Sequence, residues 1–208
     1  MKPALLIIDM QNAFCRDEGS MKRIGLNVEP LRASIPHIQK LMDVAHQTHV
    51  PVIFTRYVYQ PDYSDGGVLI EELFPQIKDQ DGLKAGTWDI EIIDDLEPSV
   101  QDIIIDKNRY SAFYNTPLDS ILQQTNIDTL IVTGVTTNMC VESTVRDAHY
   151  RDYRVWVVRE ATAEVDPQRH EAALTTIAFG FGRVISVAEA MARLRGLSTS
   201  ALISSQEV

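Results

Sequence analysis

The 208-residue sequence has little cysteine, no long apolar run and a shortage of positive charge. Two cysteines, Cys15 and Cys140, are too few for a disulfide framework and form no CxxC zinc pair. A disulfide between these two cysteines stays open, although a reducing compartment disfavours it. No run of about 18 apolar residues is present, so no membrane span is expected. The formal net charge of −10 argues against a nucleic-acid partner, because an acidic chain repels phosphate backbones.

Targeting and metal-binding patterns are also missing. The first strand-like run begins at Ala4, which leaves no room for a charged region and a separate hydrophobic signal core. We therefore expect a cytoplasmic protein. The patterns HxH and HExxH are missing as well, so we expect no metal and no other cofactor.

The apolar residues that are present gather in short runs rich in β-branched side chains. Little polar alternation occurs in these runs, which is typical of strands covered on both faces of a parallel sheet. Helical patterns lie between them, and two helices are expected to begin after Thr116-Pro117 and Asp166-Pro167, since Pro is favoured in a first helical turn. The alternation predicts a three-layer α/β fold. The strand-like runs are residues 4–8, 52–54, 103–105, 130–132, 155–158 and 184–185, and the main helical stretches are 31–49, 140–150 and 169–179.

The length suits one domain, which we place at residues 1–195. Residues 196–208 are small and polar, and we expect them to form a flexible C-terminal tail. Residues 60–97 are rich in glycine and proline and are expected to form loops and short helices over one end of the sheet. Long connections of this kind often cover active sites.

Three reactive side chains follow three of the predicted strands. Asp9 ends the first strand, Lys107 ends the third, and Cys140 lies six residues beyond Gly134, where the fourth ends. Ligands of parallel sheets bind at the carboxyl ends of the strands, so an acid, an amine and a thiol are expected to meet at one edge.

This arrangement is suited to nucleophilic catalysis. Cys140 is expected in the first turn of its helix, where the helix dipole and a nearby Lys107 would lower the thiol pKa. Asp9 could accept the thiol proton, and backbone N–H groups around Thr136 and Cys140 could hold an oxyanion. A small buried structural cysteine is equally compatible with the spacing.

A Cys–His site is the competing interpretation. His149 lies nine residues along the same predicted helix, about 13 Å from Cys140 at 1.5 Å per residue, and cannot reach the sulfur. His170 could approach the sheet edge, but no local pattern marks it. We interpret all five histidines as structural or solvated, because their spacing provides no mutual site geometry.

Three segments resemble the isochorismatase-like cysteine hydrolase superfamily. Residues 6–15, LIIDMQNAFC, resemble its opening signature, residues 107–113, KNRYSAF, its lysine segment, and residues 134–141, GVTTNMCV, its cysteine segment. Thr144, Arg146 and Ala148 continue the last pattern. The likeness extends to about Ala190, and three motifs in the same order make it highly specific.

The resemblance implies a doubly wound, mainly parallel six-stranded sheet flanked by helices, with a catalytic triad of Asp9, Lys107 and Cys140. It also implies a cis peptide between Val135 and Thr136, which would direct the Thr136 N–H toward an oxyanion shared with Cys140. Members of the superfamily are commonly dimers or tetramers, so a homodimer or homotetramer is expected.

The same resemblance indicates the reaction. True isochorismatases cleave a vinyl ether and lack the cysteine, so Cys140 argues against them. Nicotinamidases carry an Asp-x-His metal motif where residues 55–59 read TRYVY. Residues 107–122 look most like ureidoacrylate amidohydrolases, with partial likeness to biuret and N-carbamoylsarcosine hydrolases. The resemblance therefore implies a small carbamoyl or ureido substrate cleaved through a thioester, although this chain lacks the N-terminal extension typical of the ureidoacrylate enzymes. The alternatives are a nicotinamidase-like or other aromatic amide hydrolase, and a non-catalytic member.

The substrate pocket is predicted from aromatic and polar residues near these motifs. We expect aromatic walls from Phe14, Trp88, Tyr110 and Phe113, and polar contacts from Asn12, Arg56 and Thr136. Gln11 is expected to bond back to the active-site turns.

Overall fold

The centre of the fold is a parallel six-stranded sheet, in a computed structural model that describes residues 1–196. The strand order is β3-β2-β1-β4-β5-β6, and every pair of neighbours is parallel. This confirms the predicted doubly wound α/β fold. The strands are β1 (Pro3–Ile8), β2 (Val52–Tyr57), β3 (Ile103–Lys107), β4 (Thr129–Val135), β5 (Arg154–Ala163) and β6 (Arg183–Ile185).

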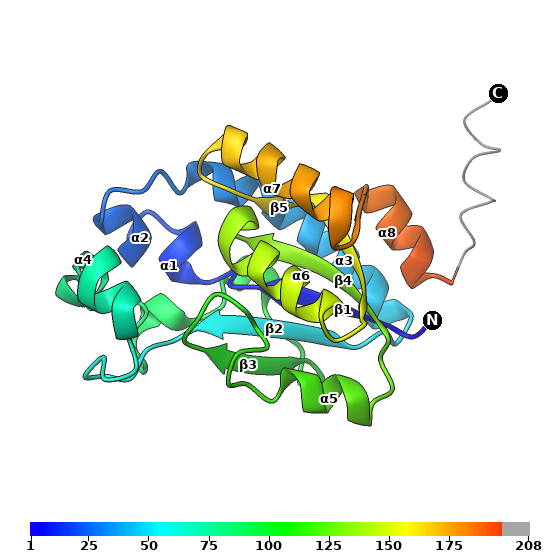
Figure 1. Ribbon diagram of the computed structural model, residues 1–208, viewed down its shortest axis with the longest axis horizontal. Coiled ribbons are helices and arrows are strands. Elements are labelled where there is room, and N and C mark those ends of the chain that lie inside the picture. The colour runs from blue at the N-terminus through cyan, green and yellow to red at the C-terminus, as the bar shows by residue number, and fades with distance from the viewer. Residues whose placement is uncertain (197–208) are drawn as a thin grey trace.

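Helices cover both faces of the sheet and complete the three layers. One face carries α3 (Ile35–Gln47) and α8 (Val187–Leu194), which contact each other and β5. The opposite face carries α6 (Glu142–His149) and α7 (Pro167–Gly180), together with α5 (Leu118–Gln124). Figure 1 shows α6 in front of the strands and α3 behind them.

Short helices gather beyond the carboxyl ends of the strands. In Figure 1, α1, α2 and α4 lie to the left, beyond the arrowhead of β2. This placement agrees with the prediction that residues 60–97 cover one end of the sheet. The short elements are α1 (Asn12–Cys15), α2 (Ser20–Arg23) and α4 (Gln76–Asp79), the 3₁₀ turns η1 (Glu29–Ser34), η3 (Trp88–Ile90) and η4 (Asp94–Leu96), and the π turns η2 (Leu69–Leu73) and η5 (Thr137–Val141).

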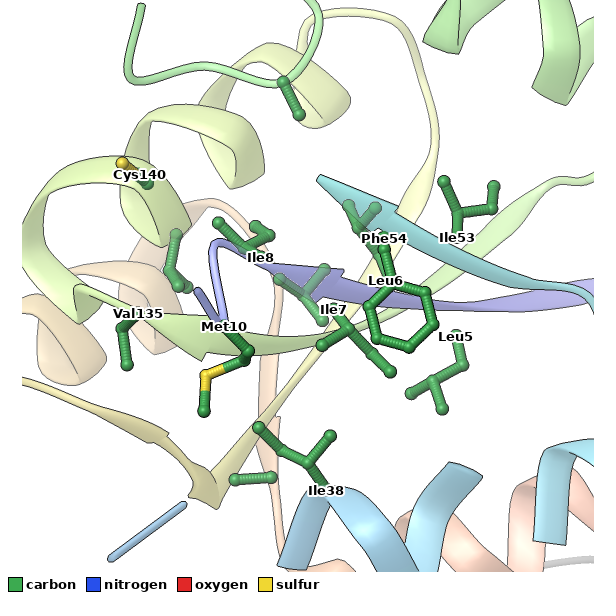
Figure 2. Close-up of a cluster of buried hydrophobic side chains, with 14 of the residues drawn as sticks. Leu5, Leu6, Ile7, Ile8, Met10, Ile38, Ile53, Phe54, Val135 and Cys140 are labelled. Atoms are coloured by element: carbon green, nitrogen blue, oxygen red, sulfur yellow. The ribbon is translucent and has the colours of Figure 1, made fainter. Parts of the chain in front are cut away.

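The core is built around β1. Its residues 4–8 are completely buried, which explains why this strand reads as a continuous apolar run. Figure 2 shows these side chains beside Phe54 of β2, with Ile38 of α3 approaching from below. Burying one such side chain contributes about 1.5–3 kcal/mol, so the sheet centre is a rigid base for the residues that follow it.

Helix boundaries follow the proline positions. The predicted helix 31–49 starts as the 3₁₀ turn η1, and α3 begins at Ile35 with Pro36 in its first turn, where a missing N–H costs nothing. Asp166 caps α7 as expected, since its carboxylate accepts a 2.8 Å hydrogen bond from the Gln168 N–H. Within residues 1–196, no helix is long and apolar enough to cross a membrane. Beyond Gly196, the tail predicted for 196–208 lies outside the described residues.

Candidate active site

The site begins where β1 and β4 end side by side, at the point where the strand order reverses. Gly134 pairs with Ile8 and has a φ of +103°, and a Cβ on it would lie 2.1 Å from the Ile8 carbonyl oxygen. Only glycine permits this approach. Asp9 follows directly with a φ of 53°, so both strand ends turn into the crevice that parallel sheets use for ligands.

Asp9 and Lys107 form a completely buried ion pair. The Lys107 Nζ donates to the Asp9 Oδ2 at 2.6 Å and to the Arg109 carbonyl at 3.1 Å. The Thr55 Oγ1 donates to the other carboxylate oxygen at 2.7 Å. Both side chains are 0% exposed. Because buried charges are costly without partners, these bonds hold the carboxylate and the ammonium in a single geometry.

Cys140 completes the cluster from η5, the turn that follows β4. Its Sγ lies 3.4 Å from the Lys107 Nζ, and its carbonyl accepts a 2.7 Å bond from the Thr144 Oγ1. Burial raises the pKa of the thiol above its ordinary value, Lys107 lowers it, and the neighbouring Asp9 raises it again. The net direction is opposite to the lowered pKa expected from the sequence, because desolvation outweighs the lysine. A raised pKa favours the protonated thiol of Cys140 at neutral pH.

The turn between β4 and Cys140 is sharply folded. The Val135–Thr136 peptide is cis, and the Thr136 carbonyl accepts bonds from the N–H groups of Met139 at 3.1 Å and Val141 at 3.2 Å. Thr136 and Cys140 both line the adjacent cavity. Their backbone N–H groups remain the predicted oxyanion donors.

Gln11 forms hydrogen bonds to the backbone of Tyr57, and the Tyr57 ring contacts Lys107 of the ion pair. The Gln11 Nε2 donates to the carbonyls of Tyr57 and Ile90, both at 3.1 Å, and its Oε1 accepts a 2.6 Å bond from the Tyr57 N–H. The Tyr57 ring lies 4.3 Å from the Lys107 Nζ, a cation–π contact. Burial raises the pKa of Tyr57, so its phenol stays neutral beside the lysine.

A cavity of about 280 Å³ opens onto Cys140. Phe14, Tyr110 and Thr136, all expected to face substrate, line it. Most of the remaining wall is apolar and comes from α2, the segment after it and the covering segment 60–97. These side chains are Met21, Ile24, Leu26, Leu69, Ile77 and Leu83.

Two of the expected polar contacts lie elsewhere. Arg56 forms two hydrogen bonds to Asp106, at 2.7 and 2.9 Å, across the pair β2 and β3. It lies on the face of β2 opposite to its inward-facing neighbours, since side chains alternate along a strand. Asn12 is buried and donates to the Trp88 carbonyl at 3.0 Å, so it ties α1 to η3 rather than lining the cavity.

Two of the aromatic side chains expected to face substrate, Trp88 and Phe113, do not line the cavity. Trp88 is 46% exposed and contributes its carbonyl, not its ring, to the packing around α1. Phe113 is buried on the other side of the lysine segment, where it stacks on Tyr153 with ring centres 5.9 Å apart. Tyr110, three residues earlier, faces the cavity instead.

The histidines and the second cysteine stand apart from the thiol chemistry. His149 packs against Phe181, with ring centres 5.5 Å apart. The His170 Nδ1 lies 2.8 Å from the Thr137 Oγ1, and burial lowers the pKa of this imidazole. Cys15 and Cys140 are both free, which excludes the disulfide left open by the sequence. Across residues 1–196, no cluster of three His, Cys, Asp or Glu side chains could hold a metal ion.

Several polar residues of the site were not predicted from the sequence, among them Thr55, Asn138, Glu164 and Arg169. Thr55 lies in β2 and orients Asp9, a role that residue type alone does not signal. Glu164 and Arg169 both line the cavity. Glu164 directly follows β5, so the strand-end rule would have found it, but the apolar run predicted a strand ending at Val158 and β5 continues to Ala163.

Similarity to known proteins identifies the family of this chain. The isochorismatase domain model matches residues 3–189. The chain belongs to the isochorismatase family. It is 37% identical over 197 residues to the ureidoacrylate amidohydrolase RutB of Methylorubrum extorquens, covering 88% of this chain and 79% of that protein.

Solved structures agree with this family membership. A cysteine hydrolase from Pseudomonas syringae pv. phaseolicola 1448A superposes with a TM-score of 0.86 at 33% identity, covering 94% of this chain and 93% of that one. An N-carbamoylsarcosine amidase from Thermoplasma acidophilum gives a TM-score of 0.72 at 29% identity, covering 90% and 97%. The family member described here is therefore a hydrolase of non-peptide C–N bonds.

Proposed function

We propose that the protein is a cysteine-dependent amidohydrolase that cleaves a small carbamoyl or ureido compound through a thioester intermediate. The observation that carries the proposal is the buried cluster of the Asp9 carboxylate, the Lys107 ammonium and the Cys140 thiol at the end of the cavity. A purely structural cysteine would not require two buried, mutually paired charges beside it.

The first half-reaction uses the thiol as it rests. Asp9 accepts the thiol proton while the sulfur attacks the substrate carbonyl carbon, which gives a tetrahedral oxyanion held by the backbone N–H groups of Thr136 and Cys140. The C–N bond then breaks as Asp9 passes the proton to the departing nitrogen. Ammonia or an amine leaves, and the acyl group stays on the sulfur as a thioester.

The second half-reaction restores the enzyme. Asp9 takes a proton from an attacking water, the new tetrahedral species collapses, and the C–S bond breaks. The sulfur recovers a proton from Asp9, and the acid or carbamate leaves. Lys107 stays protonated throughout, stabilising first the carboxylate and then the developing thiolate.

The preference for a carbamoyl or ureido substrate is inferred from the names of related proteins, and not from the Asp9, Lys107 and Cys140 cluster. One relative is named a ureidoacrylate amidohydrolase and one structural neighbour an N-carbamoylsarcosine amidase. Both names describe small substrates that carry a carbamoyl nitrogen, and a cavity of about 280 Å³ is suited to a molecule of that size.

The test is ammonia release from a substrate panel of ureidoacrylate, biuret, N-carbamoyl amino acids and nicotinamide. The proposal predicts turnover of at least one carbamoyl or ureido compound and none by Cys140→Ala, whose melting temperature should stay close to that of wild type. Nicotinamide as the sole substrate would replace the ureido class with an aromatic amide. A panel in which no compound is hydrolysed would support a non-catalytic member.

The proposal includes a homodimer or homotetramer in the cytoplasm. Exposed aromatic side chains support association, since Phe179 is 94% exposed and Tyr150 is 69% exposed. Light scattering after size-exclusion chromatography tests the assembly, and a monomer at micromolar concentration would contradict it.

A further inference from the structure

A buried carboxylate on the cavity wall is only half satisfied. The side chain of Glu164 is 3% exposed, and its Oε1 accepts a 3.1 Å bond from the Arg169 guanidinium. Its second oxygen, Oε2, is buried and has no hydrogen-bond partner among the described residues. An unsatisfied buried acceptor is destabilising, and more so when it is charged, so a ligand donor that reaches this oxygen gains binding energy.

The charge of the cavity wall restricts which ligand can supply that donor. Glu164 and Arg169 are the only charged side chains among the described residues of the lining, and they are paired with each other. No second cation lines this wall to receive a substrate carboxylate. An anionic substrate would therefore meet a free carboxylate oxygen and an arginine whose charge is already paired with Glu164 through its Nη2.

The side of the wall formed by α2 and the covering segment favours apolar groups. The covering side chains Leu69, Ile77 and Leu83, together with Met21 and Ile24, offer no hydrogen-bonding group. Burying an apolar substituent against them is favourable, whereas a carboxylate would lose its hydration there.

We propose that Glu164 determines substrate specificity by accepting an N–H hydrogen bond from an uncharged urea or carbamoyl substrate with an apolar substituent. Arg169 holds the carboxylate through Oε1 and leaves Oε2 for the substrate. The cavity thereby discriminates against ureido acids that carry a free carboxylate. This inference rests on the proposed function and narrows its substrate class.

The first experiment compares kcat/KM for phenylurea and for ureidoacrylate. Wild type should prefer phenylurea. Glu164→Gln should lower the phenylurea-to-ureidoacrylate ratio about 10-fold to 100-fold, the range expected for losing a charged hydrogen bond and a repulsive charge. Glu171→Gln is the matched control, because Glu171 forms an exposed pair with Arg159 outside the lining, and its ratio should equal that of wild type. An unchanged ratio in Glu164→Gln would overturn the proposal.

Two further variants separate acceptor loss from misfolding. Glu164→Leu removes the acceptor without leaving a buried amide, and it should raise the KM for phenylurea while thermal melting shows a folded protein. Arg169→Gln removes the donor that holds the Glu164 carboxylate, so it should raise the KM for phenylurea and weaken the preference for this substrate. A selective loss of ureidoacrylate hydrolysis in Arg169→Gln would instead make the arginine a carboxylate receptor, which contradicts the proposal.

A binding measurement distinguishes failure of the subsite from failure of the proposed reaction. Calorimetry should detect phenylurea binding to Cys140→Ala and at least 10-fold weaker binding to the double variant with Glu164→Leu. If wild type hydrolyses no compound but this difference is found, the reaction is wrong and the subsite stands. If wild type hydrolyses ureas but the two affinities are equal, the reaction stands and the subsite is wrong.

Discussion

The proposed triad and the cavity wall differ in how their side chains are held in place. Asp9 follows the central strand β1 and Lys107 ends the edge strand β3, and both side chains are completely buried and held by short hydrogen bonds. The wall comes from short helices and connections, and its side chains are mostly apolar with few directional contacts. The proposed reacting groups are thus positioned by the sheet, whereas the proposed substrate contacts come from segments that can change without disturbing it.

Removing one charge of the triad should have the largest effect. Asp9→Asn leaves the Lys107 ammonium buried without its carboxylate and removes the proton acceptor. We expect a loss of kcat/KM on the order of 10³ or more from the missing base. The free energy of unfolding should fall by about 3–5 kcal/mol in urea denaturation, as for other buried pairs that lose one partner. Normal turnover in this variant would remove Asp9 from the mechanism.

The thiol should respond to pH as a protonated, buried group. Because burial raises the pKa of Cys140 above its ordinary value of 9.0, its thiolate fraction grows about tenfold per pH unit across the neutral range. Alkylation by iodoacetamide, followed by peptide mapping to separate Cys140 from Cys15, should accelerate about 100-fold from pH 7 to pH 9. A plateau below pH 8 would show a lowered pKa instead.

The raised pKa of Cys140 also makes the stability of the folded protein depend on pH. A group whose pKa is raised on folding keeps its proton in the folded state while the unfolded chain loses it. Cys140 therefore contributes stability that is fully present below about pH 9 and declines as the pH rises further. Burial raises the pKa of Cys15 to about 12, which adds a contribution of the same sign.

A change in the wall should affect binding more than chemistry. Leu69 is partly buried in η2 and faces the cavity. Leu69→Ala should raise KM about 5-fold to 10-fold, equivalent to roughly 1–1.4 kcal/mol of lost apolar contact, with kcat nearly unchanged. Steady-state kinetics on the best panel substrate measures both constants. An equal fall in kcat would mean that the wall also positions the reacting groups.

The smallest effect is expected for Arg56, which the sequence suggested as a substrate contact. Its pair with Asp106 is partly exposed, so Arg56→Gln should cost at most about 1 kcal/mol of stability. Activity should be unchanged within twofold. A rise in KM in this variant would return Arg56 to the binding site.

Strand polarity explains why the clustering of Asp9, Lys107 and Cys140 was predictable. The residues that follow buried parallel strands must meet at one edge, and this rule applies to Asp9, Lys107 and the segment before Cys140 without any side-chain information. The fold followed from the same apolar runs, because β1 and β4 are buried on both faces and show no alternation.

The residues of the cavity wall were predicted less well than the clustered side chains, and this difference also has physical reasons. Residue type alone does not tell which way a side chain points, so Tyr110 and Phe113 were both assigned to the cavity, and of the two Tyr110 faces it. In β5 the apolar run stops at the charged residues Arg159 and Glu160, whereas pairing resumes after an irregularity and ends beside Glu164. Burial around Cys140 was likewise invisible in the sequence, and it reversed the expected direction of the thiol pKa.

The most direct test of the mechanism is the mass of the enzyme during turnover. Wild-type protein is mixed with a saturating ureido substrate, quenched in acid within milliseconds, digested and analysed by mass spectrometry. With a thioester intermediate, we expect the peptide containing Cys140 to gain the mass of the substrate acyl group. This adduct should disappear as substrate is consumed. An acyl group on another residue, or an unmodified Cys140 throughout active turnover, would contradict this mechanism.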